Sequence, residues 1–248
     1  AHANFIFAGT SRLAQSLIQN APGSVFPCDV PPFATCTAGA YVVPMLGTAP
    51  SAKIYALKVF PSQGGGSPES RIIAAMDRAI TIQVVNLSLG GPPLFAGRDI
   101  EDQLTLALPD AGITVVTSAG NDGFAAMTGG SPGTGFGSLT IGASSTPVHE
   151  RVLRDNQFGV GIGALYRPFN GVQTAYFSSR GPTADGRFDP DLSANGFASY
   201  VNVFAAVVNG ALVSCGAPGG AATCASRILF TSGTSFSSPT VAGAAALL

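Results

Sequence analysis

Short apolar runs alternate with helix-like stretches through the middle of the chain. Residues 67–79 and 100–108 have helical character, with Pro68 and Glu69 at the start of the first stretch, where both residue types are favoured. The apolar runs cover residues 52–60, 83–88, 113–119 and 139–143. This alternation is typical of a parallel sheet covered by helices on both faces. The sequence therefore predicts one α/β domain over residues 1–248, with a mostly parallel central sheet flanked by helices.

Two loops at strand ends are the first places to look for a functional site. Ligands of open parallel sheets bind at the carboxyl ends of the strands, and here those ends lead into the loops after Ser88 and Ala119. Further strands are expected at 200–207 and 227–233, and a helix from Thr234 onwards. That last helix has neither a cap nor a terminal glycine, so we expect the domain to be incomplete at this end.

Charge and hydropathy exclude several classes of protein. Lys and Arg number 12 and Asp and Glu 13, which gives a net charge of −1 and leaves no basic face for nucleic acid or an anionic membrane. The uncharged stretch 192–226 is broken by Asn, Pro and Gly, whereas a spanning helix needs about 20 mostly apolar residues. Hydrophobic residues make up 46% of the chain, enough for a sizeable core. We therefore expect a folded domain that binds neither nucleic acid nor a membrane.

Four cysteines form two pairs that are close in sequence, Cys28 with Cys36 and Cys215 with Cys224. Zinc ligands usually stand only about two to four residues apart, so this spacing does not suit a zinc finger. Two disulfides that close local loops are the favoured interpretation, and they imply an oxidising, extracellular location. The alternative is four free, buried thiols.

The segment 233–243, Gly-Thr-Ser-Phe-Ser-Ser-Pro-Thr-Val-Ala-Gly, is the most informative part of the sequence. Ser235 stands where a helix should begin, beside unpaired backbone N–H groups that could hold an oxyanion. A serine hydroxyl becomes a nucleophile only with a base within hydrogen-bond reach. By itself the segment supports two readings of Ser235, a nucleophile or a simple helix cap.

The same segment resembles the nucleophile motif of the subtilisin-like serine proteases. Four further segments, in the order of that family, are similar to its motifs: 47–52, 86–91, 118–123 and 176–183. Together the five motifs span residues 47–248. The resemblance implies a three-layer fold with a seven-stranded, mostly parallel sheet between helices, and a serine endopeptidase that acts on polypeptides, is secreted and is a monomer.

The resemblance also assigns roles to individual residues. Ser235 would be the nucleophile, and Asn121 would donate its side-chain amide to the oxyanion, together with the Ser235 backbone N–H. Taken alone, Asn121 has the alternative interpretation of a turn residue before Asp122 and Gly123.

Two backbone segments would then bind the substrate as added strands. Ser88, Leu89 and Gly90 would pair with the peptide and form one wall of its primary pocket. The other wall would be formed by Ala119 and Gly120. The segment with Gly65 and Gly66 matches a second substrate-binding edge, with a flexible loop as the alternative.

The general base is the open point of the assignment. The family pattern His-Gly-Thr-His-Val-Ala-Gly, which begins a helix, corresponds best to residues 2–9, with His2 as the base. From His2 to Gly9 there are seven steps instead of six, so an inserted residue is needed. His2 could instead be a frayed terminal residue. The other histidine, His149, lies in an expected polar surface loop and comes after Asn121, against the order of the family.

The acid that orients the base has no counterpart. The family carries it in an Asp-Thr/Ser-Gly motif before the histidine, and only Ala1 precedes His2. Either the chain is incomplete at its N-terminus or it belongs to a lineage that lost the triad. In both cases we expect residues 1–248 alone to be a poor peptidase, and in the second an inactive domain that binds peptides or partner proteins through the same cleft.

Other chemistries are not supported. The glycine-rich segments 133–137 and 159–163 do not connect a strand to a helix, which argues against dinucleotide binding. The Gly-x-Ser-x-Gly motif of α/β-hydrolases is not formed around Ser235. No cofactor is expected. Calcium is common among subtilisin-like proteases, but no acidic loop can be assigned to it.

Overall fold

The computed structural model describes residues 2–8, 40–61, 65–208, 211–214 and 225–248 of the chain. Side chains are described in residues 47–61, 65–151, 153–155, 157–199 and 231–248. The four cysteines lie outside the described residues, and so does the side chain of His2.

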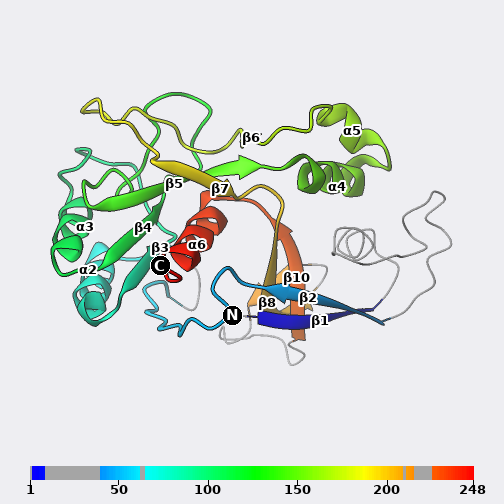
Figure 1. Ribbon diagram of the computed structural model, residues 1–248, viewed down its shortest axis with the longest axis horizontal. Coiled ribbons are helices and arrows are strands. Elements are labelled where there is room, and N and C mark those ends of the chain that lie inside the picture. Colours follow the sequence, from blue (N-terminus) through cyan, green and yellow to red (C-terminus); the bar gives the residue numbers. More distant parts are fainter. Residues whose placement is uncertain (1, 9–39, 62–64, 209–210, 215–224) are drawn as a thin grey trace.

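A five-stranded sheet forms the centre of the fold (Figure 1). Its strands are β3 (Val84–Leu87), β4 (Thr114–Ser118), β5 (Ser138–Ser145), β6 (Gln173–Thr174) and β7 (Leu192–Asn195). The pairs β3–β4, β4–β5 and β5–β7 are parallel, and only the short β6 runs antiparallel to β5. The predicted mostly parallel sheet is therefore confirmed. It has five strands in the described residues, against the seven implied by the resemblance.

Helices cover both faces of this sheet. Neighbouring residues of a strand point to opposite faces, so one strand can pack against helices on both sides. Val115 of β4 packs with α2 (Glu69–Arg78) and α3 (Ile100–Asp110) in one buried cluster. The next residue, Val116, packs on the opposite face with Ala242 of α6 (Thr234–Ala245). The result is the predicted three-layer arrangement.

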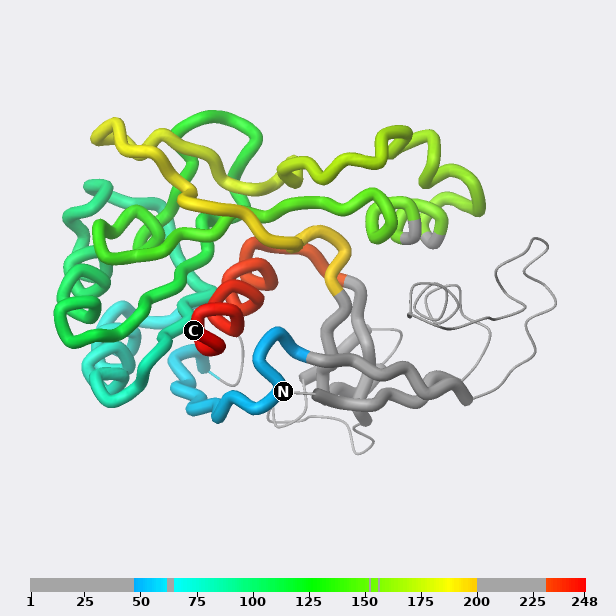
Figure 2. The backbone as a smooth tube through the Cα atoms, in the orientation of Figure 1, coloured from blue at the N-terminus to red at the C-terminus, as the bar shows by residue number. Residues whose placement is uncertain are grey.

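The two faces use different kinds of helix. Helix α2 is amphipathic and buries Ile72 and Met76, four residues apart and so on one side of the helix. Helix α6 consists mostly of small residues and can lie close to its neighbours. A Cβ at Gly243 would come within 2.8 Å of Thr48 Cβ, and Figure 2 shows the end of α6 beside the segment that starts at residue 47.

Smaller elements complete the described fold. Helices α4 (Pro147–Phe158) and α5 (Ile162–Tyr166) follow β5, and a 3-10 turn, η3 (Ala79–Thr81), follows α2. Strands β8 (Ser199–Val208), β9 (Ala211–Ser214) and β10 (Ala225–Thr231) form an antiparallel sheet. Strands β1 (His2–Ala8) and β2 (Ala40–Leu46) form an antiparallel pair.

Three local predictions were wrong. No strand is described at residues 52–60, where the chain forms no ladder with β3 and leaves Ile54 and Tyr55 exposed. Residues 2–8 form a strand paired with residues 40–46 instead of beginning a helix. His149 lies in helix α4 rather than in a surface loop. Among the described residues, none of the helices has the length and apolar character needed to cross a membrane.

Candidate active site

Ser235 lies in the first turn of helix α6, which begins at Thr234 directly after the glycine at position 233. The Gly233 amide donates to Gly196 O at 2.8 Å, and this bond ties the start of the helix to the loop after β7. Backbone N–H groups in a first helical turn have no partner within the helix. The Ser235 hydroxyl and amide therefore stand at the positive end of α6.

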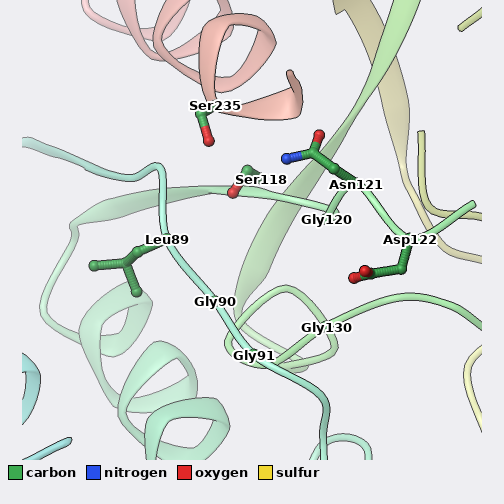
Figure 3. Close-up of a pocket in the computed structure, with 9 residues that line it drawn as sticks. All are labelled: Leu89, Gly90, Gly91, Ser118, Gly120, Asn121, Asp122, Gly130 and Ser235. Atoms are coloured by element: carbon green, nitrogen blue, oxygen red, sulfur yellow. The ribbon is translucent and has the colours of Figure 1, made fainter. Parts of the chain in front are cut away.

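Asn121 is held against the start of the same helix. Its Oδ1 accepts hydrogen bonds from the Thr234 amide at 2.8 Å and from Thr234 Oγ1 at 3.1 Å. Because donors occupy Oδ1, the other end of the side chain must be the NH₂ group. Figure 3 shows this Nδ2 on the side of Asn121 that faces Ser235. The amide is thus oriented before any ligand arrives.

The loop that carries Asn121 is fixed from two sides. Gly120 donates its amide to Thr234 Oγ1 at 3.2 Å. Its φ of +107° favours glycine, and a Cβ there would come within 2.7 Å of Ser179 Oγ. Ser179 Oγ in turn accepts the Asp122 amide at 3.2 Å. Hence the Ser-Ser turn at residues 178–179 and the helix start together set the position of Asn121.

Ser88 connects the end of β3 to α6. Its hydroxyl lies 3.0 Å from Ser235 O, 2.9 Å from Ser238 Oγ and 2.9 Å from Asn86 Nδ2. A hydroxyl has one proton to donate, so Ser88 donates to Ser235 O and accepts from the other two groups. The Ser88 side chain therefore supports the helix that bears Ser235.

A pocket of about 260 Å³ opens beside Ser235 (Figure 3). It is lined by Leu89, Gly90, Gly91, Ser118, Gly120, Asn121, Asp122, Gly130 and Ser235. Four of these nine residues are glycines, so backbone forms much of the wall. Asp122 is the one ionisable side chain in this lining.

The structure brings together five of the predicted site residues in this lining: Leu89, Gly90, Gly120, Asn121 and Ser235. Two more lie directly behind it, Ser88 in the contacts above and Ala119, which is fully buried and donates its amide to Ile141 O. Gly65 and Gly66 do not line the pocket, and a Cβ at either position would meet open space.

Sequence reasoning missed several residues of the site. Asp122 and Thr234 stand beside predicted residues in their motifs, and this position is the sequence signal that marks them. Gly91 and Gly130 are brought to the pocket by backbone hydrogen bonds. Gly91 and Ser131 exchange two bonds of 3.0 Å, and Gly130 donates to Ala119 O at 3.1 Å. Gly130 lies in none of the five motifs, and no sequence signal marks it.

The structure describes the side chain of His149 but only the backbone of His2. His149 is not among the residues that line the pocket. Its Nδ1 lies 3.3 Å from Asn195 Nδ2, and burial lowers the pKa of the imidazole. His2 is placed only through its backbone, which pairs with Leu46. Within the described residues, no group of three His, Cys, Asp or Glu side chains could hold a metal ion.

Known proteins resemble this chain in sequence. The Subtilase family, Peptidase S8, matches residues 30–248. Pyrolysin of Pyrococcus furiosus is 35% identical over 209 residues, which cover 82% of this chain and 14% of pyrolysin. Serine protease AprX of Bacillus subtilis is 31% identical over 221 residues, which cover 82% of this chain and 43% of AprX.

The fold has a counterpart among solved structures. The S41 psychrophilic protease superimposes with a TM-score of 0.52 at 22% identity, over 79% of this chain and 54% of that protein. The chain thus spans about half or less of these relatives. The family match, however, extends over most of its 248 residues. The chain therefore belongs to the subtilase family of serine peptidases.

Proposed function

We propose that this protein is a secreted serine endopeptidase and that Ser235 is its nucleophile. The observation that carries the proposal is the orientation of Asn121, whose Oδ1 is held by Thr234 while Nδ2 faces Ser235. An amide aimed in advance at the reacting centre needs no reorganisation as negative charge develops there. Such an arrangement suits acyl transfer to a serine.

In the proposed reaction the Ser235 hydroxyl attacks the scissile carbonyl of a polypeptide. The carbonyl oxygen becomes an oxyanion, which accepts hydrogen bonds from Asn121 Nδ2 and the Ser235 amide. Removing one such donor costs about 10²–10³-fold in kcat, a magnitude established for subtilisin, a member of this family. The histidine that accepts the serine proton gives it to the leaving amine as the peptide bond breaks, and water then hydrolyses the acyl-serine with the same histidine as base.

The substrate would lie along the segment 88–90 as an added strand, with Gly65 and Gly66 as a second edge. Backbone pairing of this kind recognises an extended peptide whatever its side chains. One substrate side chain would enter the pocket between Leu89 and Gly120, the two walls already described.

His2 is proposed as the general base, and no Asp-Thr/Ser-Gly motif stands before it in this sequence. Without a carboxylate to orient the imidazole, residues 1–248 alone should react slowly. In subtilisin, loss of that carboxylate costs about 3 × 10⁴-fold in kcat. The proposed enzyme thus needs an acid that the five motifs do not supply.

A fluorophosphonate probe tests the nucleophile. We expect the protein as its gene encodes it to be labelled at Ser235 and to cleave an internally quenched peptide, whereas residues 1–248 alone should be labelled much more slowly. Ser235→Ala should abolish labelling, and Ser237→Ala on the same helix should not. Labelling at another serine, or cleavage that survives Ser235→Ala, would refute the assignment. A protein that binds peptides but is never labelled would support the inactive, peptide-binding alternative.

We further propose that the protein is secreted and monomeric, and that it contains the disulfides Cys28–Cys36 and Cys215–Cys224. Closing a loop of about ten residues should stabilise the fold by about 3 kcal/mol. Mass mapping of non-reduced peptides should find these two pairs. Four free thiols, or a bridge between the two pairs, would contradict the prediction.

A further inference from the structure

Asp102 is a fully buried carboxylate without a described charged partner. It lies in the first turn of α3 and has 0% exposure. Its Oδ2 accepts the Gly97 amide at 2.8 Å, and its Oδ1 accepts Ser131 Oγ at 2.9 Å. Thr134 Oγ1 lies within 3.3 Å of both oxygens. Each donor described for this carboxylate is therefore neutral.

Burial of a carboxylate costs free energy even when hydrogen bonds compensate it. Burial raises the pKa of Asp102, although the bonds from Ser131, Thr134 and Gly97 oppose the shift. An apolar residue at this position could not accept the hydrogen bonds from Gly97, Ser131 and Thr134. The role of Asp102 follows from the contacts that its partners Ser131 and Thr134 make elsewhere.

Ser131 and Thr134 belong to the turn that closes the pocket. Ser131 exchanges two backbone hydrogen bonds of 3.0 Å with Gly91, which lines the pocket directly after the wall residue Gly90. The preceding residue, Gly130, donates to Ala119 O behind the other wall and itself lines the pocket. The turn is closed by a bond of 3.1 Å from the Thr134 amide to Gly130 O. Both walls are thus joined through the turn 130–134.

We propose that Asp102 is a positioning residue for substrate, which anchors the turn 130–134 to helix α3 and so keeps the two walls of the pocket at the spacing that a substrate side chain requires. This inference rests on the proposed peptidase function of the site. Asp102 does not touch substrate. It acts through Ser131, whose side chain binds the carboxylate while its backbone binds Gly91.

Asp99 provides a matched control. It is the residue before α3, and its carboxylate accepts the amides of Leu94 at 3.0 Å and Phe95 at 3.2 Å. It therefore ties down the turn before the helix without a described bond to residues 130–134. Loss of either aspartate loosens the start of α3, but only loss of Asp102 should loosen the pocket.

Two covalent probes distinguish a change in the pocket from a change in the reactivity of Ser235. A small fluorophosphonate reports the reactivity of Ser235, and a tripeptidyl diphenyl phosphonate ending in a leucine analogue also requires a formed pocket. For Asp102→Ala we expect the ratio of the peptidyl rate to the small-probe rate to fall about tenfold, the typical scale of one lost bond to a charged group. Asp99→Ala should leave the ratio within about twofold, by the same scale. An unchanged ratio in Asp102→Ala, or an equal fall in Asp99→Ala, would overturn the proposal.

Hydrogen exchange gives a readout that does not depend on activity. The amides of Gly91 and Ser131 bond to each other's carbonyls, so peptides containing them should exchange faster in Asp102→Ala and not in Asp99→Ala. If neither probe labels the wild-type protein, the peptidase proposal fails, and unchanged exchange would then refute the role of Asp102 as well. If Asp102→Ala does not fold, Ser131→Ala, which removes only the hydroxyl, should show the same faster exchange at Gly91.

Discussion

At the scale of the residue, the site depends on side chains that hold other side chains. Thr234 is fully buried and touches no substrate in the proposed reaction, yet its amide and hydroxyl orient Asn121 while the hydroxyl also accepts the Gly120 amide. The orientation of Asn121, the proposed oxyanion donor, thus depends on the start of α6. This dependence can be measured.

Thr234→Val should lower kcat more than it changes KM. The substitution keeps the volume and the backbone amide but removes the hydroxyl bonded to Asn121 and Gly120. We expect kcat to fall about tenfold, less than the loss of the whole oxyanion donor, because the bond from the Thr234 amide remains. Thr240→Val is the control, because the Thr240 hydroxyl donates a hydrogen bond to Phe236 O within α6. Equal effects of the two variants on kcat would contradict the role of Thr234.

Asp122 should bias the pocket towards cationic substrate side chains. It is an exposed carboxylate and the one ionisable side chain of the lining. Exposed charge pairs are worth only about 0–1 kcal/mol, so kcat/KM for a Lys substrate relative to its Glu analogue should fall about threefold in Asp122→Asn. The difference should shrink as salt is added. Asp110→Asn, an exposed change of the same charge, should leave the ratio unaltered, and a preference for Glu in the wild type would refute this prediction.

At the scale of the element, α6 approaches the sheet more closely than ordinary side chains allow. Its small residues pack on β3, β4, β5 and β7, and Gly196 lets the first turn of α6 lie against the loop after β7. This close approach places Ser235 beside the end of β3. The position of Ser235, the proposed nucleophile, is therefore a packing property of the whole helix.

Gly196→Ala should displace the start of α6. A Cβ at this position would overlap Ser237 Oγ and come within 2.7 Å of Gly233 O. Overpacking of this kind typically costs about 1–3 kcal/mol, and we expect both a lower Tm and slower labelling of Ser235. Gly171→Ala is the control, because its Cβ would meet open space. Unchanged Tm and labelling in Gly196→Ala would show that the helix start tolerates the displacement.

At the scale of the whole molecule, stability should depend on pH through Asp189. Desolvation raises the pKa of this carboxyl group to about 6, with the charge of Asp191 as the next cause. Its Oδ2 is buried, and no hydrogen bond to it is described. A pKa that is higher in the folded state favours folding below the unfolded pKa, and this gain is lost as pH rises through about 6.

Asp189→Asn should therefore raise Tm at pH 8 and change it little at pH 4. Asp185→Asn is the counterpart, because hydrogen bonds from Arg187 and Thr183 lower the pKa of Asp185. That variant should lower Tm at pH 8, where the carboxylate and its bonds are present, and have less effect in acid. Thermal unfolding at the two pH values measures both. A lower Tm for Asp189→Asn at pH 8 would reverse the predicted sign.

The sequence by itself determined the elements whose signal is local. Alternating apolar runs identified β3, β4 and β5 and the helices α2 and α3, since periodicity and helix-start residues act within a few neighbours. The motifs likewise placed Ser235 and Asn121 at the ends of elements that parallel topology brings together. The apolar run 52–60 was wrongly predicted to be a strand, because apolar composition alone does not provide a neighbouring strand to pair with.

Only the tertiary structure decided how the pocket is closed. Gly130 and Asp102 belong to no motif, and they reach the site through backbone bonds and a buried carboxylate that join segments distant in sequence. The side of Asn121 that faces Ser235 was likewise decided by Thr234, 113 residues further along the chain. Such contacts carry no local periodicity, because a hydrogen bond constrains the distance between two atoms and leaves their separation in sequence free.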